Sequence, residues 1–261
     1  MLYGIGLIYA LIWLVRRREA VSQSLISLTE IALAFHLVSL VESFRFNGRL
    51  VLTTMHQVES LLAFLMMLFF IGVFYAYKTS SPSVFVFPAV FLLTLSAAVA
   101  QQPPQFSSPF LRSGWIFFHI ALIFAGYAAL FFSFVASILY LLQERKLKSK
   151  QVGGILAKLP SLETIDDLGY RSLLLGFPFM TLGLIAGSVM AQVEFGPAFF
   201  HDPKVLLSLL MWGVYLVMLY TRLSIGWRGR RAAFLSAFAF AAAVSAWVAN
   251  YFSSMHRFIS Q

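Results

Sequence analysis

The 261-residue chain contains no cysteine and few charged residues. Without thiols it cannot form a disulfide, an iron–sulfur cluster, a thiolate metal site or the covalent haem attachment of a CxxCH motif. Charged residues make up 11% of the chain, against about 25% in soluble domains. A soluble protein of this size could not cover its surface with so few charges. Because 60% of the residues are apolar and the mean hydropathy is +0.85, we interpret the chain as an all-α integral membrane protein.

Eight apolar stretches are candidates for membrane-spanning helices, which need roughly 20 mostly apolar residues each. They cover approximately residues 2–15, 23–41, 57–77, 82–100, 115–141, 173–193, 205–221 and 232–252. The sequence therefore predicts a bundle of about eight transmembrane helices in a single polytopic domain over residues 1–261. A connecting segment at about 142–172 begins with a basic run and continues past Pro160. There Ser161 is expected to cap a short helix at the membrane interface, with Asp166 and Asp167 near its positive end.

The formal net charge of +9 follows from where the cations lie. Over alternate connections, fourteen lysines and arginines fall on one side of the membrane and five on the other. The five are Arg45, Arg49, Arg112, Lys204 and Arg257. Since cytoplasmic connections are enriched in cations, the richer side is expected to be cytoplasmic and both termini extracytoplasmic. The charge is thus a topology signal, and no nucleic-acid partner is expected.

Four ionisable side chains lie inside the apolar stretches, namely Glu30, His36, Glu59 and His119. Such residues are costly in hydrocarbon and by default face the protein interior or a site. All five histidines fall toward the extracytoplasmic side of the predicted topology: His36, His56, His119, His201 and His256. Unrelated core histidines should be spread over both leaflets. Imidazole commonly ligates haem iron, so two histidines from separate helices would suit a non-covalent haem in a chain without cysteine.

Structural explanations stay open for these residues. Any single membrane histidine can serve in packing, through hydrogen bonds to a neighbouring helix. His56 and Glu59 share a helix face, which suits either a carboxylate that orients a ligand histidine or a buried polar pair. Gly183 and Gly187 have the GxxxG spacing that allows two helices to approach closely.

Three stretches carry longer motifs. The first reads Trp115-Ile116-Phe117-Phe118-His119 and is followed by Gly126-Tyr127. The second reads Ser161-Leu162-Glu163-Thr164, then Leu168-Gly169-Tyr170-Arg171 and Gly176-Phe177-Pro178. The third reads Tyr220-Thr221-Arg222, then Gly226-Trp227-Arg228-Gly229-Arg230-Arg231. Together with a weaker match over Leu40–Phe64, these stretches resemble the CcsA/HemX type of cytochrome c assembly proteins, a haem-handling membrane family.

This resemblance implies a haem at the outer face, held between two external histidines over a tryptophan-rich loop. His119 matches the first histidine, and His256, after the last predicted helix, matches the second. They are the candidate axial ligands of a non-covalent haem b, whether it is bound stably or in transit. Residues expected to form the outer wall or to contact the haem propionates are Phe199, Phe200, His201 and Asp202.

The chain departs from the family pattern at two places. The loop pattern W-G-x-Y-W-x-W-D-P-K-E is replaced by the residues from Phe195 to Val205, which keep the Gly and the Asp-Pro-Lys but no tryptophan. His36 lies near the first membrane histidine of the family and is a further candidate haem contact, but Tyr220 occupies the second position. These losses point toward the HemX-like branch, which is linked to control of haem biosynthesis as well as to assembly.

We therefore expect a haem-handling protein of cytochrome c assembly in the bacterial cytoplasmic membrane. It would present haem to apocytochrome c or to a partner assembly membrane protein. No catalytic residue is assigned, and the chain is a candidate component of a haem lyase system. Ligation by two histidines leaves no open position on the iron, so oxygen chemistry is not expected. Two alternatives stay open: a haem-free structural or regulatory subunit that keeps the fold, and a small-solute transporter that uses Glu30 and Glu59.

Overall fold

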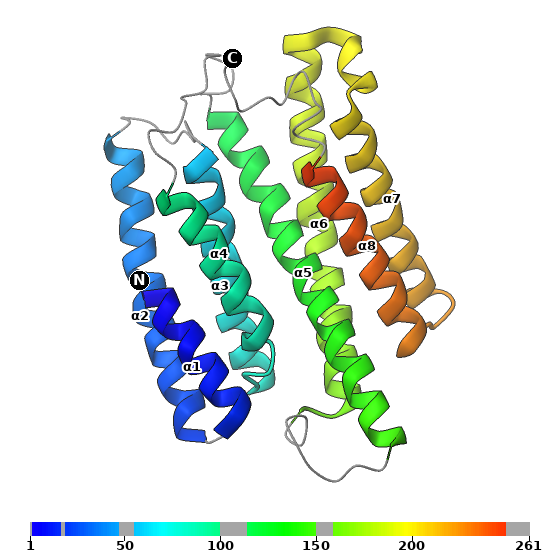
Figure 1. Ribbon diagram of the computed structural model, residues 1–261. Coiled ribbons are helices and arrows are strands. Elements are labelled where there is room, and N and C mark those ends of the chain that lie inside the picture. Colours follow the sequence, from blue (N-terminus) through cyan, green and yellow to red (C-terminus); the bar gives the residue numbers. More distant parts are fainter. Residues whose placement is uncertain (1, 17–18, 47–54, 100–113, 150–158, 249–261) are drawn as a thin grey trace.

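The computed structural model describes residues 2–16, 19–46, 55–99, 114–149 and 159–248 (Figure 1). Within these ranges the chain forms eight α-helices, one 3-10 helix and no strand, which confirms the predicted all-α class. The elements are α1 (Leu2–Arg16), α2 (Glu19–Phe46), α3 (Met55–Tyr77), α4 (Ser83–Val99), α5 (Gly114–Lys148), α6 (Leu162–Phe195), η2 (Gly196–His201), α7 (Pro203–Leu223) and α8 (Arg230–Val248).

The lengths and compositions of the helices are those of a multi-pass membrane protein. Five of the described helices, namely α2, α3, α5, α6 and α7, are long and apolar enough to cross a membrane. Shorter apolar helices cover Leu2–Val15 and Ser83–Val99. Each of the eight predicted stretches coincides with one α-helix, so the predicted number and order of helices are confirmed.

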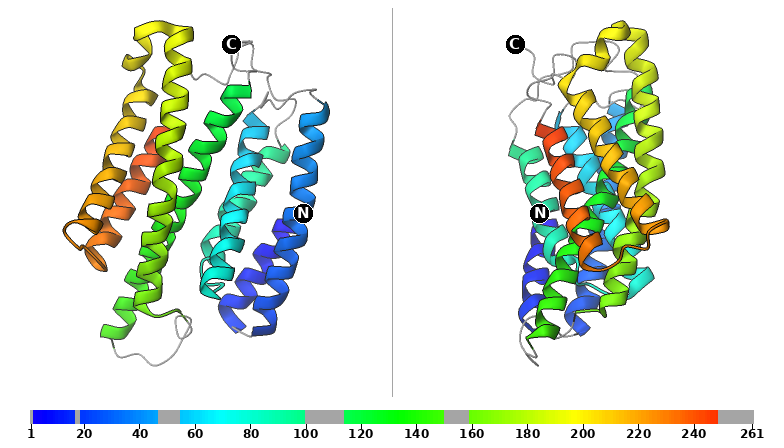
Figure 2. Two further views of the ribbon diagram at one scale, coloured as in Figure 1. Left: turned by 180° about the vertical axis from the view of Figure 1, so that it is seen from behind. Right: turned by 90° about the vertical axis from the view of Figure 1, so that its right-hand side faces the viewer.

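Helix α5 runs through the middle of the molecule, with α1–α4 on one side and α6–α8 on the other (Figures 1 and 2). It contacts α3, α6 and α8. Its buried residues belong to two hydrophobic cores, because side chains on different faces of α5 point toward different halves of the molecule. Phe132 and Val135 pack into the core shared with α1–α4, whereas Leu130 packs into the core shared with α6–α8.

Consecutive helices run in opposite directions, so their connections alternate between two ends of the molecule. We call one end the cation-rich end; α1–α2, α3–α4, α5–α6 and α7–α8 are connected there. The other is the histidine end, where η2 connects α6 to α7 and where α3 and α5 begin, close to His56 and His119. This grouping agrees with the predicted alternation, and the side of the membrane that each end faces stays a prediction.

Helix α6 is longer than expected, since it begins at Leu162 rather than near residue 173. Ser161 caps it, as predicted, and its side chain accepts a hydrogen bond of 3.2 Å from the Thr164 N–H. Ile165, Leu168 and Leu173 are all buried, so one apolar face continues through the whole region. The short helix expected at the interface is therefore the beginning of α6.

Candidate functional site

His119 lies in the second turn of α5 and its ring packs against α6 at the histidine end. Its Nδ1 atom is 2.7 Å from the backbone oxygen of Gly183. The ring covers Gly187, where a Cβ atom would overlap the imidazole. A Cβ on Gly183 would instead meet Ile123 of α5. The predicted close approach at the GxxxG spacing is thus confirmed, and one of its glycines provides the space that the histidine ring occupies.

The hydrogen bond to Gly183 decides which nitrogen of His119 is available to a ligand. A backbone carbonyl only accepts, so Nδ1 must donate a proton to it. In a neutral imidazole the lone pair then resides on Nε2. Histidines that ligate metals are usually held in this way, with the second ring nitrogen donating to a carbonyl or carboxylate. The hydrogen bond therefore fixes the tautomer that ligation through Nε2 would require.

The loop that replaces the tryptophan-rich pattern forms η2, and its aromatic residues divide into buried and exposed ones. Phe199 is 2% exposed and Phe200 is 47% exposed, with their ring centroids 4.2 Å apart. His201 ends η2 and is exposed. Phe199 therefore holds the loop onto the bundle, whereas Phe200 and His201 are at the surface of the histidine end.

Asp202 has a structural role that was not among the predictions, although Asp before a Pro that begins a helix is a common N-cap pattern. It is the N-cap of α7, and its Oδ1 atom accepts a hydrogen bond of 2.9 Å from the Lys204 N–H. Its side chain is buried. A buried carboxylate repels a second carboxylate, so this position suits a propionate poorly.

Lys204 was not a predicted site residue, although the retained Asp-Pro-Lys is the part of the loop that could have indicated it. The side chain is half-buried. Lys204 is the second residue of α7 and follows directly on the Asp202 cap. Lys204 is therefore a cation at the histidine end, where η2 meets α7.

His36 contacts other helices than His119 does. Its Nδ1 is 2.9 Å from the Tyr3 hydroxyl of α1, and its Nε2 is 2.8 Å from the Ser60 hydroxyl of α3. Both ring nitrogens are thus engaged in holding α1, α2 and α3 together. Tyr220 is 60% exposed and lies near the end of α7 at the cation-rich end. The structure therefore does not bring His36 and Tyr220 together as a pair of ligands.

His256, the second candidate axial ligand, lies outside the described residues. His56 is the second residue of α3, and in the part of the chain that the structure describes its buried Nδ1 has no hydrogen-bond partner. Among the described residues no three histidine, aspartate or glutamate side chains gather into a metal-binding group. The pairing of His119 with His256 stays a prediction.

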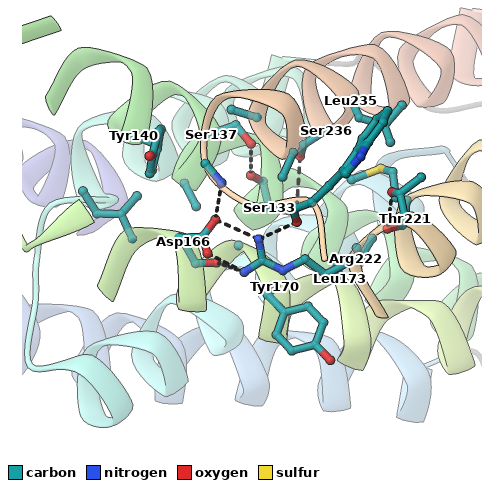
Figure 3. A pocket seen from close by; sticks show the side chains of 18 residues that line it. Ser133, Ser137, Tyr140, Asp166, Tyr170, Leu173, Thr221, Arg222, Leu235 and Ser236 are labelled. Atoms are coloured by element: carbon teal, nitrogen blue, oxygen red, sulfur yellow. Dashed lines mark hydrogen bonds and ion pairs between the residues drawn. The ribbon is translucent and has the colours of Figure 1, made fainter. Parts of the chain in front are cut away.

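A second polar cluster, which the sequence analysis missed, lies at the cation-rich end (Figure 3). Arg222 of α7 donates to Asp166 of α6 over 2.9 Å between Nη1 and Oδ1, and their side chains are 10% and 18% exposed. The Gly229 N–H donates to the same carboxylate over 3.0 Å. The ion pair forms one wall of a cavity of about 40 Å³, which is also lined by the hydroxyls of Ser133, Ser137 and Ser236. A cavity of this size is large enough for a water molecule and too small for a porphyrin.

The neighbouring Asp167 connects α6 to the other half of the molecule. It accepts a hydrogen bond of 2.9 Å from the Tyr77 hydroxyl of α3 and forms an ion pair of 2.8 Å with Arg171. The two adjacent aspartates therefore attach the beginning of α6 to α3 on one side and to α7 on the other. Both interactions stabilise the relative positions of the helices at the cation-rich end.

Comparison with known proteins places these features in one family. The model of the family described as "Cytochrome C assembly protein" matches residues 28–258. The cytochrome c biogenesis protein CcsA of Heterosigma akashiwo is 31% identical over 219 residues, which cover 70% of this chain and 68% of that protein. CcsA of Guillardia theta is 31% identical over 203 residues, with coverages of 70% and 67%. CcsA of Parasynechococcus marenigrum is 35% identical over 149 residues, or 49% of each chain.

Proposed function

Because the chain belongs to the cytochrome c assembly family and is of the CcsA type, we propose that it binds haem b non-covalently at the histidine end and presents it to an apocytochrome c or to a partner assembly membrane protein. The orientation of His119 supports this proposal. Gly183 holds the proton on Nδ1, Gly187 leaves room for the ring, and Nε2 retains the lone pair that iron needs.

The chain supplies binding and position, while the haem, when bound, supplies the vinyl groups that react with the thiols of the apocytochrome. His119 of α5 and His256, which follows α8 in the sequence, are the residues that would hold the iron. Phe200 and His201 are exposed at the histidine end and would contact the porphyrin. Since the chain has no cysteine, both thiols must belong to the partner.

The proposed location is the bacterial cytoplasmic membrane, with the histidine end outside. Cations that fall on the cation-rich end support this orientation, because cytoplasmic connections are enriched in lysine and arginine. The haem would then be held on the extracytoplasmic face.

The proposal is tested by the haem content of the purified protein. The chain is purified in detergent, incubated with haem and analysed by reduced-minus-oxidised and pyridine haemochrome spectra. We expect haem in the intact protein and lower occupancy in His119→Ala and in His256→Ala. His36→Gln is the matched control, because both nitrogens of His36 already bond within α1–α3. An intact protein that takes up no haem contradicts the proposal.

A haem-free regulatory or structural subunit is the second candidate. It is favoured by the burial of Phe199, which removes one aromatic face from a loop that already lacks tryptophan, and by the exposure of Tyr220. It predicts that a membrane complex co-purifies through residues 142–172 or through the loop with Arg228 and Arg231, while no haem is found. The transporter alternative has less support, because Glu30 lies at the surface and accepts a hydrogen bond from Tyr75.

A further inference from the structure

Glu30 is a carboxylate on the outer surface of α2, inside a membrane-spanning segment. The segment covers Ser22–Ser43, and the Ser22 hydroxyl is hydrogen-bonded to Ser80 in the connection from α3 to α4 at the cation-rich end. Eight residues along α2 from Ser22 correspond to a rise of about 12 Å, which places Glu30 well inside a hydrocarbon core of about 30 Å. Glu30 is exposed on the single chain. A carboxylate at this depth is costly unless protein covers it.

The chain itself compensates only part of the Glu30 carboxylate. The Tyr75 hydroxyl of α3 donates a hydrogen bond to it, and Tyr75 is 51% exposed. An ionised carboxylate can accept about four hydrogen bonds through its two oxygens. Lys78 lies over the Tyr75 ring, 5.1 Å from the ring centroid, and so contacts the ring face. None of the ion pairs among the described residues includes Glu30.

The exposed face of α3 beside Glu30 leaves room for another helix. Leu68, Gly72 and Ala76 are exposed and follow one another at intervals of four residues, next to Tyr75. A Cβ atom on Gly72 would meet nothing within 4 Å. In membranes, two small residues at this spacing allow helices to approach closely. We call Glu30, Gly72, Tyr75 and Ala76 the α2–α3 surface; it combines an incompletely compensated charge with space for a second backbone.

The α2–α3 surface is separate from the candidate haem site. Helix α2 packs against α1 and α3, and it lies at the edge of the molecule away from α6–α8 (Figures 1 and 2). The His119 ring packs instead against Gly187 of α6. A helix bound to the α2–α3 surface would therefore leave the histidine ring uncovered.

Charge complementarity decides which kind of helix fits this surface. A second copy of the chain, related by a two-fold axis through the surface, would bring two Glu30 carboxylates together, and like charges repel each other. A helix with a lysine or arginine at the same depth would instead supply the missing cation and further hydrogen-bond donors. Ionisable residues inside membranes usually pair with one another in this way.

We propose that the α2–α3 surface binds a transmembrane helix of a partner membrane protein, and that this helix carries a lysine or arginine opposite Glu30. Tyr75 positions the carboxylate, while Gly72 and Ala76 admit the backbone of the partner. The inference goes beyond the proposed function, because it assigns a contact surface outside the haem site. It holds whether or not the chain binds haem.

A synthetic transmembrane helix is the probe that tests this surface. The peptide has about 20 leucine and alanine residues with one central arginine, and a matched peptide carries leucine at that position. The full chain, labelled through Ser149→Cys, is reconstituted with labelled peptide in phosphatidylcholine vesicles, and association is measured by energy transfer. We expect the arginine peptide to bind roughly tenfold more tightly than the leucine peptide, the size of a charge-assisted hydrogen bond.

Three variants separate the charge, the space and the position of the site. Glu30→Gln keeps an oxygen that accepts from Tyr75 but removes the charge, so it should bind both peptides equally. Gly72→Leu fills space that is open in the single chain, so it should weaken binding without changing the thermal unfolding of the chain. Glu42→Gln removes another exposed carboxylate of α2, near the opposite end of the span, and as the matched control it should bind like the wild type.

The proposal is overturned if the wild type and Glu30→Gln bind the arginine peptide equally, or if Gly72→Leu binds it as the wild type does. Energy transfer between two labelled copies of the chain that disappears in Glu30→Gln would identify a self-interface and also overturn the choice of partner. The haem content of the same samples keeps the two proposals apart, because Glu30→Gln should hold as much haem as the wild type. A wild type that binds the arginine peptide but no haem overturns only the proposed function.

Discussion

Single residues decide whether the His119 ring keeps its orientation. The hydrogen bond from Nδ1 to the Gly183 carbonyl fixes the tautomer, and the missing side chain at Gly187 provides the space. Both glycines would act on the proposed haem through the histidine. Interactions of this kind around a metal ligand commonly matter almost as much as the ligand itself.

The substitution Gly187→Ala tests this indirect role. Its Cβ would overlap the imidazole, so the ring must rotate and lose its bond to Gly183. We expect haem occupancy to fall by roughly tenfold or more, as for other changes around metal ligands. Gly213→Ala in α7 is the matched control, because a Cβ there meets nothing within 4 Å. A Gly187→Ala protein with full occupancy would show that the ring does not depend on this space.

His36 should affect stability more than haem content. His36→Ala removes hydrogen bonds to Tyr3 and Ser60 and leaves both hydroxyls without their partner. The cost in unfolding free energy is about 1–3 kcal/mol, which a thermal unfolding curve in detergent detects. A large loss of haem in a protein of unchanged stability would instead place His36 among the haem contacts.

The elements show what could be predicted from the sequence and what could not. Long apolar runs predict helices well, so the number, order and alternation of helices are confirmed. The interpretation of Asp166 as a residue that favours a helix start was incomplete. Its partner Arg222 is 56 residues away, and periodicity within one helix says nothing about such a pair. The same limit applies to His119 and Gly187, whose contact depends on how α5 and α6 align.

Asp166 and Asp167 provide a prediction at the scale of elements. Asp166→Asn should destabilise the protein by about 3–5 kcal/mol, because it leaves the largely buried Arg222 without its ion partner. Asp167→Asn should cost about 1 kcal/mol or less through its ion pair, because the side chain of Arg171 is 71% exposed. Thermal unfolding of the two variants in detergent gives the comparison. Equal effects would mean that burial does not distinguish the two ion pairs.

At the scale of the whole molecule, most lysines and arginines of the described residues lie toward the cation-rich end, and the described histidines lie toward the other end. This separation connects topology with function. In the proposed orientation, the charges at one end face the cytoplasm, and the proposed site is at the other end, where an apocytochrome outside the cytoplasm could reach it. Because the chain has no cysteine, single introduced cysteines can report which side of the membrane each end faces.

Single cysteines can be placed at either end of a chain that has none. Ser149→Cys lies after α5 at the cation-rich end, and Pro197→Cys lies in η2 at the histidine end; both positions are exposed. In intact cells, a membrane-impermeant maleimide should label Pro197→Cys and should label Ser149→Cys only after the membrane is opened. The reverse pattern would place the histidine end in the cytoplasm.

The most direct measurement is the visible spectrum of haem-loaded His119→Gly with and without added imidazole. Removing the side chain should lower haem occupancy and abolish the low-spin spectrum expected for two histidine ligands. Free imidazole, which supplies the missing ligand in the space left open, should restore that spectrum. A His119→Gly protein whose occupancy and spectrum equal those of the wild type, with no response to imidazole, would contradict ligation of haem by His119.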